Sequence, residues 1–198
     1  LRGAVLDGAQ FTKAMLVNMQ APESQWHGAM LNEVIAYGAQ LGGASLDGAR
    51  FTKVVLTGAQ APNSRWQCAR FTKTLLNLAK LGGADFRHAL GNQSCWRGSE
   101  LHGSDWRDAG LHRCDLGEAI APGADLRNAS FGQCLLMRAN LTGVDARGAD
   151  FFQAMLRKTD LRSADLRDAN LVRVLDEAAD YRDARFDGAA RTKAGEAA

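Results

Sequence analysis

The sequence predicts a solenoid, a fold built by stacking short repeats, because one five-residue register runs through almost the whole chain. In blocks of five from Leu1, the first residue of each block is apolar through position 186, except at Gly91 and Asp176. The residue two places before each of these is small: of the 39 such positions from 4 to 194, 25 are Ala. A period of five fits neither a helix nor an alternating strand. It is typical of proteins in which each repeat buries its apolar side only against its neighbours.

A second, longer period predicts how many repeats make one coil. Residues 1–40 and 41–80 share 18 identities, and Pro22, Pro62 and Pro122 are separated by 40 and 60 positions. Both separations are multiples of 20, which agrees with the coil of four repeats that the family resemblance described below implies. Residues 1–190 then make about 9.5 coils, and a coil spacing of roughly 4.8 Å gives a rod about 46 Å long.

Several segments carry a family resemblance: Ala84-Asp85-Phe86, Ala124-Asp125-Leu126, Ala139-Asn140-Leu141, Ala149-Asp150-Phe151, Ala164-Asp165-Leu166 and Ala169-Asn170-Leu171. They resemble the pentapeptide repeat family, whose unit reads A-(D/N)-L-x-x. The resemblance covers residues 1 to about 190 and implies an all-β fold, a right-handed quadrilateral parallel β-helix. The central residue of each unit and the small residue two before it would point inward, and the other three outward. Of the 21 Gly, 14 lie two residues after a central position, where a turn favours positive φ.

The domain prediction is one β-helix over residues 1–190 and a frayed tail over 191–198, where Arg191 and Glu196 occupy central positions. The chain does not start with Met and its first residue is already in register, so we interpret it as a piece of a longer chain or a trimmed one. No run of 18 apolar residues predicts a membrane span, and no signal peptide is recognised.

The four Cys residues lack the C-x-x-C spacing of zinc and redox sites. We interpret them as reduced thiols of a cytoplasmic protein, with a Cys114–Cys134 disulfide as the alternative. The four His residues would face outward on three different sides, and no catalytic or phosphate-binding motif is present. The sequence therefore predicts no enzyme activity, catalytic residue, metal or cofactor.

The outward residues can be sorted onto four faces, which we name first to fourth after their central residues Leu1, Leu6, Phe11 and Leu16. The second face repeats an Asp-x-Arg pair in five consecutive coils, from Asp85/Arg87 to Asp165/Arg167. We interpret this ladder as a self-neutralised wall, because neighbouring Asp residues offset the repulsion between Arg residues. The alternative is a guanidinium ladder that a partner's carboxylates recruit.

The third face is basic, with nine cationic residues against Glu33 and Asp150. Its candidate binding residues are Lys13, Arg50, Lys53, Arg70, Lys73 and Arg113. One interpretation is a solubilising wall. The other is an electrostatic footprint for an acidic protein, a membrane surface or nucleic acid. Phe152 is the one outward aromatic residue of this face, which disfavours base stacking.

The fourth face departs from the family pattern, since the position normally held by Asp or Asn is mostly apolar there. A stripe about 43 Å long and about 10 Å wide would expose about 400 Å², which is at or above what a monomer usually exposes without a use. The candidate partner-binding residues are Met15, Ile35, Tyr37, Val55, Leu75, Leu135, Met137, Met155 and Leu175. The alternative is that neighbouring backbone half covers these side chains.

The function hypothesis is a non-catalytic interaction scaffold, one domain of a larger bacterial protein, that docks a protein partner or a second copy of itself through the fourth face. The resemblance offers adaptor proteins of the type VI secretion system as one example. The rival hypothesis is DNA mimicry, by which some family members protect DNA gyrase from quinolones. A mimic needs a strongly acidic wall, yet the most acidic face here carries ten acidic and seven basic residues. Because the third face is basic, binding to nucleic acid or to a membrane surface is a further alternative.

Overall fold

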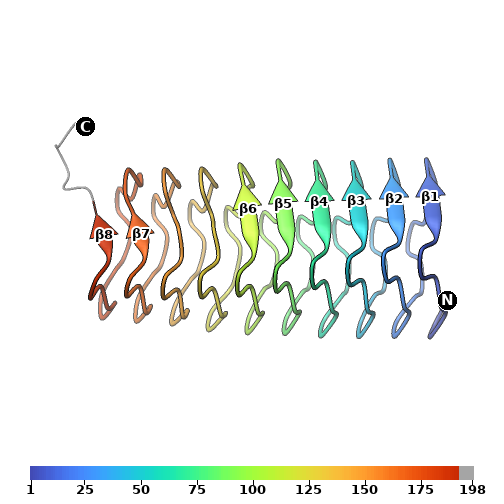
Figure 1. Ribbon diagram of the computed structural model, residues 1–198, viewed down its shortest axis with the longest axis horizontal. Helices are drawn as coiled ribbons and strands as arrows, with labels where there is room; N and C mark the ends of the chain where they lie inside the picture. The colour runs from blue at the N-terminus through green and yellow to red at the C-terminus, as the bar shows by residue number, and fades with distance from the viewer. Residues whose placement is uncertain (192–198) are drawn as a thin grey trace.

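The computed structural model describes residues 1–191 and shows a straight rod of stacked coils (Figure 1). Within these residues there is no helix. The strands are β1 (Gln10–Thr12), β2 (Met30–Asn32), β3 (Arg50–Thr52), β4 (Arg70–Thr72), β5 (Leu90–Asn92), β6 (Gly110–His112), β7 (Asn170–Leu171) and β8 (Ala190–Arg191). β1 to β6 form one parallel sheet and β7 pairs with β8, so the predicted all-β solenoid is confirmed.

Every strand lies on the third face, and each pairs with the strand one coil away. Phe11 is the register partner of Leu31, and Phe51 is the partner of Phe71. The other faces stack through isolated parallel bridges with the same spacing of 20 residues. The predicted coil of four five-residue sides is therefore confirmed. Strand β8 includes Arg191, which places this residue in the last coil, and residues 192–198 of the predicted tail lie outside the described residues.

The corners are turns whose third residue has positive φ. Every position two after a central residue, from 3 to 188, has a φ between 51° and 74°, and these positions hold 14 Gly and 24 other residues. At most corners the small residue donates a backbone hydrogen bond to the central carbonyl, as from Ala4 to Leu1 at 3.0 Å. Positive φ at the third residue alone is the signature of a type II turn. The glycine pattern in the sequence thus identified the turn position, but it did not show that every corner has a positive φ there.

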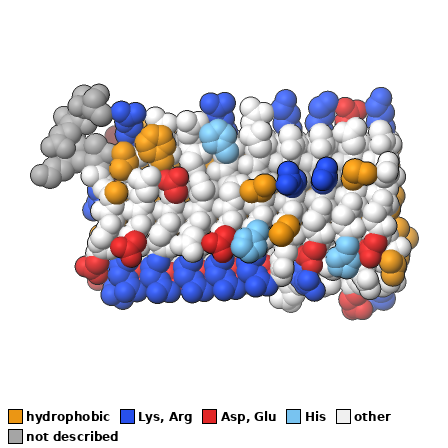
Figure 2. All heavy atoms as spheres, in the orientation of Figure 1, with side chains coloured by type: hydrophobic (Ala, Val, Ile, Leu, Met, Phe, Trp, Pro, Cys, Tyr) orange, Lys and Arg blue, Asp and Glu red, His pale blue; other side chains and the backbone are white. Residues whose placement is uncertain are grey.

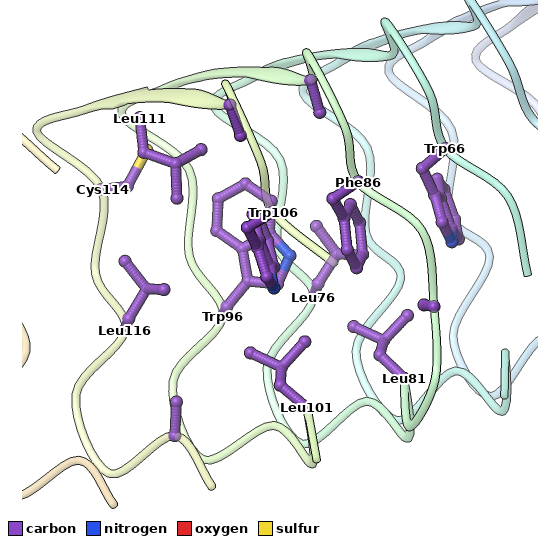
Figure 3. Packing of buried hydrophobic residues seen from close by; sticks show 14 of the residues in the cluster. Trp66, Leu76, Leu81, Phe86, Trp96, Leu101, Trp106, Leu111, Cys114 and Leu116 are labelled. Carbon is purple, nitrogen blue, oxygen red and sulfur yellow. The ribbon is translucent and has the colours of Figure 1, made fainter. Parts of the chain in front are cut away.

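Central residues fill the inside of the rod (Figure 3). Trp66, Phe71, Trp106 and Leu126 are each at most 4% exposed, as their inward assignment predicted. Gly91, an exception to the apolar register, is explained by its neighbours. A methyl group added there would lie 2.5 Å from Leu111 Cδ2 and 3.1 Å from the Trp96 ring. The larger side chains of adjacent positions occupy the space that Gly91 leaves.

Three of the four buried tryptophans share a hydrogen-bond arrangement that the register did not reveal. Trp26, Trp66 and Trp106 donate from Nε1 to the Oγ of the serine two residues earlier, at 2.6–2.8 Å. Each serine in turn donates to a backbone carbonyl. The Ser-x-Trp spacing in the sequence was the signal from which this hydrogen bond could have been predicted. Serine is therefore present at these inward positions for its hydroxyl as well as for its size.

Candidate interaction surfaces

The fourth face is a grid of rows, one per coil, in which each row presents the residue before the central position and the two residues after it. Parallel bridges join the first column from Met15 to Ile35 and onward to Leu175, so successive members lie in adjacent coils. The first four rows, at 15–18, 35–38, 55–58 and 75–78, contain no charged residue. We call these four rows the apolar half.

Large side chains of the apolar half are exposed. Met15 is 76% exposed, Leu78 66% and Tyr37 53%. Ile35, Val17 and Leu75 are exposed to a smaller extent, and Val55 is half-buried. Two of these residues, Val17 and Leu78, were not among the predicted binding residues. They follow the central position, as the predicted Tyr37 does, so the apolar surface is wider than the column of residues that precede the central position.

Charged residues divide the predicted stripe beyond Leu75. The carboxylate of Asp115 accepts a hydrogen bond from the Gly117 backbone N at 2.8 Å and lies 3.8 Å from the Arg97 guanidinium. Of the predicted residues beyond this point, Leu135, Met137 and Met155 are half-buried, and Leu175 is exposed. The sequence placed all nine predicted residues on one face, but the structure separates them into two chemically different parts.

The second part of the fourth face contains a shallow hollow of about 360 Å³. Its lining residues are Arg97, Glu118, Met137, Arg138, Arg157 and Lys158. Arg97 pairs with Glu118 at 2.5 Å, and Arg157 pairs with Glu177 at 2.6 Å. We call this feature the basic hollow. It was not predicted, because its residues come from four different coils.

The third face presents all six predicted basic residues as exposed side chains. Figure 2 shows Lys and Arg side chains spread over this face among uncharged ones, with a denser row of them along the lower edge of the view. Arg50 and Arg70 are register partners in β3 and β4. Lys53 pairs with Glu33 at 2.9 Å, and Arg113 Nε donates to Gln133 Oε1 at 2.9 Å. The face is therefore basic, and part of its charge is engaged within the chain.

The second face carries the predicted Asp-x-Arg ladder as ion pairs. In each of the five coils, Arg Nη2 lies 2.6–2.7 Å from an oxygen of the Asp two residues earlier. In the first four, Arg Nε also lies 3.5–3.9 Å from the Asp of the next coil. The hydrogen bond from Arg167 lowers the pKa of Asp165 to about 2. The self-neutralised interpretation is confirmed. The same spacing forms an unpredicted short ladder on the first face, with Asp160/Arg162 and Asp180/Arg182.

The cysteines are free thiols in the structure, with Cys114 and Cys134 buried and Cys68 exposed. Among residues 1–191, no three His, Cys, Asp or Glu side chains gather where they could hold a metal ion. The same residues include no helix long and apolar enough to cross a membrane.

Comparison with known proteins agrees with this architecture. The family model described as pentapeptide repeats matches eight copies, over residues 37–65 and 134–172. No curated protein sequence matches the chain. A solved structure of QnrB1, a plasmid-mediated fluoroquinolone resistance protein, superposes with a TM-score of 0.68 at 13% identity, covering 93% of this chain and 91% of QnrB1.

Two further solved structures are similar at a lower TM-score. HetL, a pentapeptide repeat protein involved in heterocyst differentiation regulation in the cyanobacterium Nostoc, is 23% identical with a TM-score of 0.34, covering 96% of this chain and 90% of HetL. A pentapeptide repeat protein of the Arabidopsis thaliana thylakoid lumen is 34% identical over 47% of this chain and 65% of its own, with a TM-score of 0.27. Residues 37–65 and 134–172 are therefore pentapeptide repeats, and they share one register and one coil geometry with the rest of residues 1–191.

Proposed function

We propose that this chain is a non-catalytic interaction scaffold that docks a protein partner through the apolar half of the fourth face. The observation that carries the proposal is the set of four consecutive uncharged rows in which most large side chains are exposed, with Met15, Tyr37 and Leu78 more than half exposed. Contiguous apolar surface on a soluble protein marks interaction sites. The rigid rod holds these side chains in fixed register, which lowers the entropic cost of binding.

The proposal also includes the biological setting predicted from the sequence. In that setting the chain is one domain of a larger bacterial protein in the cytoplasm, for example a secretion-system adaptor. A second copy of the chain is the alternative occupant of the apolar half. The likeness to QnrB1 supports the fold alone at 13% identity, so fluoroquinolone resistance is not carried over.

The test replaces Met15, Tyr37 and Leu78 together with Asp, and circular dichroism checks that the rod stays folded. Sedimentation velocity reports self-association, and affinity capture from the organism's extract reports partner binding. We expect the triple variant to stay folded and to lose whichever assembly the wild-type chain forms. The matched control is Met30→Asp with Leu90→Asp on the third face, where the side chains are 39% and 45% exposed. A folded triple variant that assembles like the wild type would refute the proposal.

The basic third face supports a second candidate, binding to nucleic acid or another polyanion. The supporting observation is the adjacent pair Arg50 and Arg70, both exposed on neighbouring strands. Charge reversal of both residues should then weaken binding of a short DNA duplex and flatten its salt dependence. Binding that is unchanged by this reversal would exclude the third face as the site.

A further inference from the structure

The basic hollow carries more positive charge than the chain itself neutralises. Its lining has four cationic residues and one acidic residue, Glu118. Glu118 and Glu177 are engaged by Arg97 and Arg157, respectively. Neither Arg138 nor Lys158 forms an ion pair with any residue in the range 1–191. These two side chains are available to an outside ligand.

The fold forces three of these cations together. Arg138 and Lys158 occupy equivalent positions in adjacent coils, each two residues after a central residue. The Arg138 backbone N donates a hydrogen bond to the Arg157 carbonyl at 3.0 Å. Coils are separated by roughly 4.8 Å, at which like charges repel. A bound anion between Arg138, Arg157 and Lys158 would relieve this repulsion.

The shape of the hollow favours an extended chain over a small anion. Met137 lines the hollow beside the cations and is half-buried. The absence of a side chain at Gly117 leaves room for the Arg97 guanidinium, since a Cβ at position 117 would lie 2.8 Å from Arg97 Nη1. The result is an open surface with an apolar component and cations around it, and it lacks the enclosure of a small-ligand pocket. A peptide that alternates carboxylates with aliphatic stems matches it.

The hollow also continues the surface of the proposed function. Both lie on the fourth face, with the apolar half in rows 15–78 and the hollow in the rows from Arg97 to Lys158. We propose that the basic hollow binds an acidic segment of the same partner protein that covers the apolar half. The inference that this segment belongs to the partner protein rests on the proposed function. The inference that the hollow binds carboxylates rests on the hollow alone.

The probe is a fluorescently labelled, end-capped hexaglutamate peptide, and binding to the full chain is followed by fluorescence anisotropy. The variant is Arg138→Glu with Lys158→Glu, and the matched control is Arg50→Glu with Arg70→Glu on the third face. We expect the hollow variant to bind about tenfold more weakly and the control to bind like the wild type, because a specific site loses its charge-assisted contacts. Added salt should weaken the wild-type interaction.

Several outcomes would overturn the inference: no peptide binding by the wild type, equal binding by the hollow variant, or loss in the third-face control. Displacement of the peptide by inorganic phosphate or by a DNA duplex at the peptide's own concentration would assign the hollow to another ligand class and also overturn it. The Met15/Tyr37/Leu78 variant separates the two proposals. If it assembles like the wild type while the hollow variant alone loses the peptide, the proposed function fails and the acidic-ligand site stands.

Discussion

The Tyr181 hydroxyl donates a 3.0 Å hydrogen bond to Oδ2 of Asp176, which occupies a central position that is apolar in almost every other repeat. Burial and the nearby Asp176 carboxylate raise the pKa of Tyr181, so the phenol stays protonated and donates. The Arg191 guanidinium lies 4.4 Å from the centre of the Phe186 ring, and Tyr181 packs edge-on against Phe186. These contacts explain how the C-terminal end of the rod accommodates the second exception to the apolar register.

Tyr181→Phe should destabilise the C-terminal coil. The change leaves the Asp176 carboxylate without its donor in a half-buried site, which costs about 1–3 kcal/mol. Urea unfolding followed by circular dichroism measures the loss. The double variant Asp176→Leu/Tyr181→Phe should recover most of it, because it restores an apolar central residue. A double variant as unstable as the single one would contradict this account.

Ser104→Ala should cost about 1–3 kcal/mol, because Trp106 Nε1 loses its buried acceptor. Ser99→Ala is the control. Ser99 is equally buried and donates to the Trp96 carbonyl, but it accepts no hydrogen bond from an indole. Thermal melts of the two variants isolate the contribution of the indole. Equal melting temperatures would show that serine is present only for its size.

Stability should fall between pH 4 and pH 2 as the Asp-x-Arg ladder titrates. The ladder lowers the pKa of Asp165 to about 2 from its ordinary 3.8, mainly through the hydrogen bond from Arg167. A lowered native pKa stabilises the fold above about pH 4, and this stabilisation is lost as the pH falls through 2. Asp165→Asn should therefore lower the melting temperature at pH 7 and match the wild type near pH 2.

The control for the ladder is Asp187→Asn, whose side chain is 81% exposed and lies 3.9 Å from Arg185. This variant should melt like the wild type at both pH values. An Asp165→Asn deficit that persists undiminished at pH 2 would show that the loss does not come from the ionised carboxylate.

The thiols should react with an aromatic disulfide reagent in a fixed order. Cys68 is exposed and should react first, whereas burial raises the pKa of Cys95 and slows it. Cys114 and Cys134 are both buried, so this pair should react only after unfolding. The hydrogen bond with Cys114 and burial also raise the pKa of Cys134. Peptide mass mapping checks the order. An intact mass lower by one pair of hydrogens would instead support the disulfide alternative.

The isolated chain should leave DNA gyrase supercoiling, and its inhibition by fluoroquinolones, unchanged at micromolar concentration. A DNA mimic needs a wall of free carboxylates, and the five Asp residues of the ladder on the second face are paired with Arg within the chain. A supercoiling assay with and without the drug tests this expectation. Protection of the enzyme would reverse the ranking of the two function hypotheses while leaving the fold unaffected.

The sequence by itself determined the register of the rod and which way each residue points. Only one small and one larger residue per side fit inside a narrow tube, so Phe71 and Trp66 had to be inward and Leu75 outward. It also placed Asp165 beside Arg167, because both belong to one repeat. Relations within a repeat, or between residues 20 apart, follow from the period alone.

Only the tertiary structure decided what depends on rotamers and on several coils at once. It showed that Leu78 is more exposed than Leu75 and that Arg97, Met137 and Lys158 surround one hollow. It also showed that the buried Nε1 of Trp96, unlike that of the other three tryptophans, has no hydrogen-bond partner within residues 1–191, because Ser94 bonds to Thr74 and Asn92 instead. The period fixes where each Cβ lies, but side-chain exposure and partner choice depend on competition among neighbours in adjacent coils.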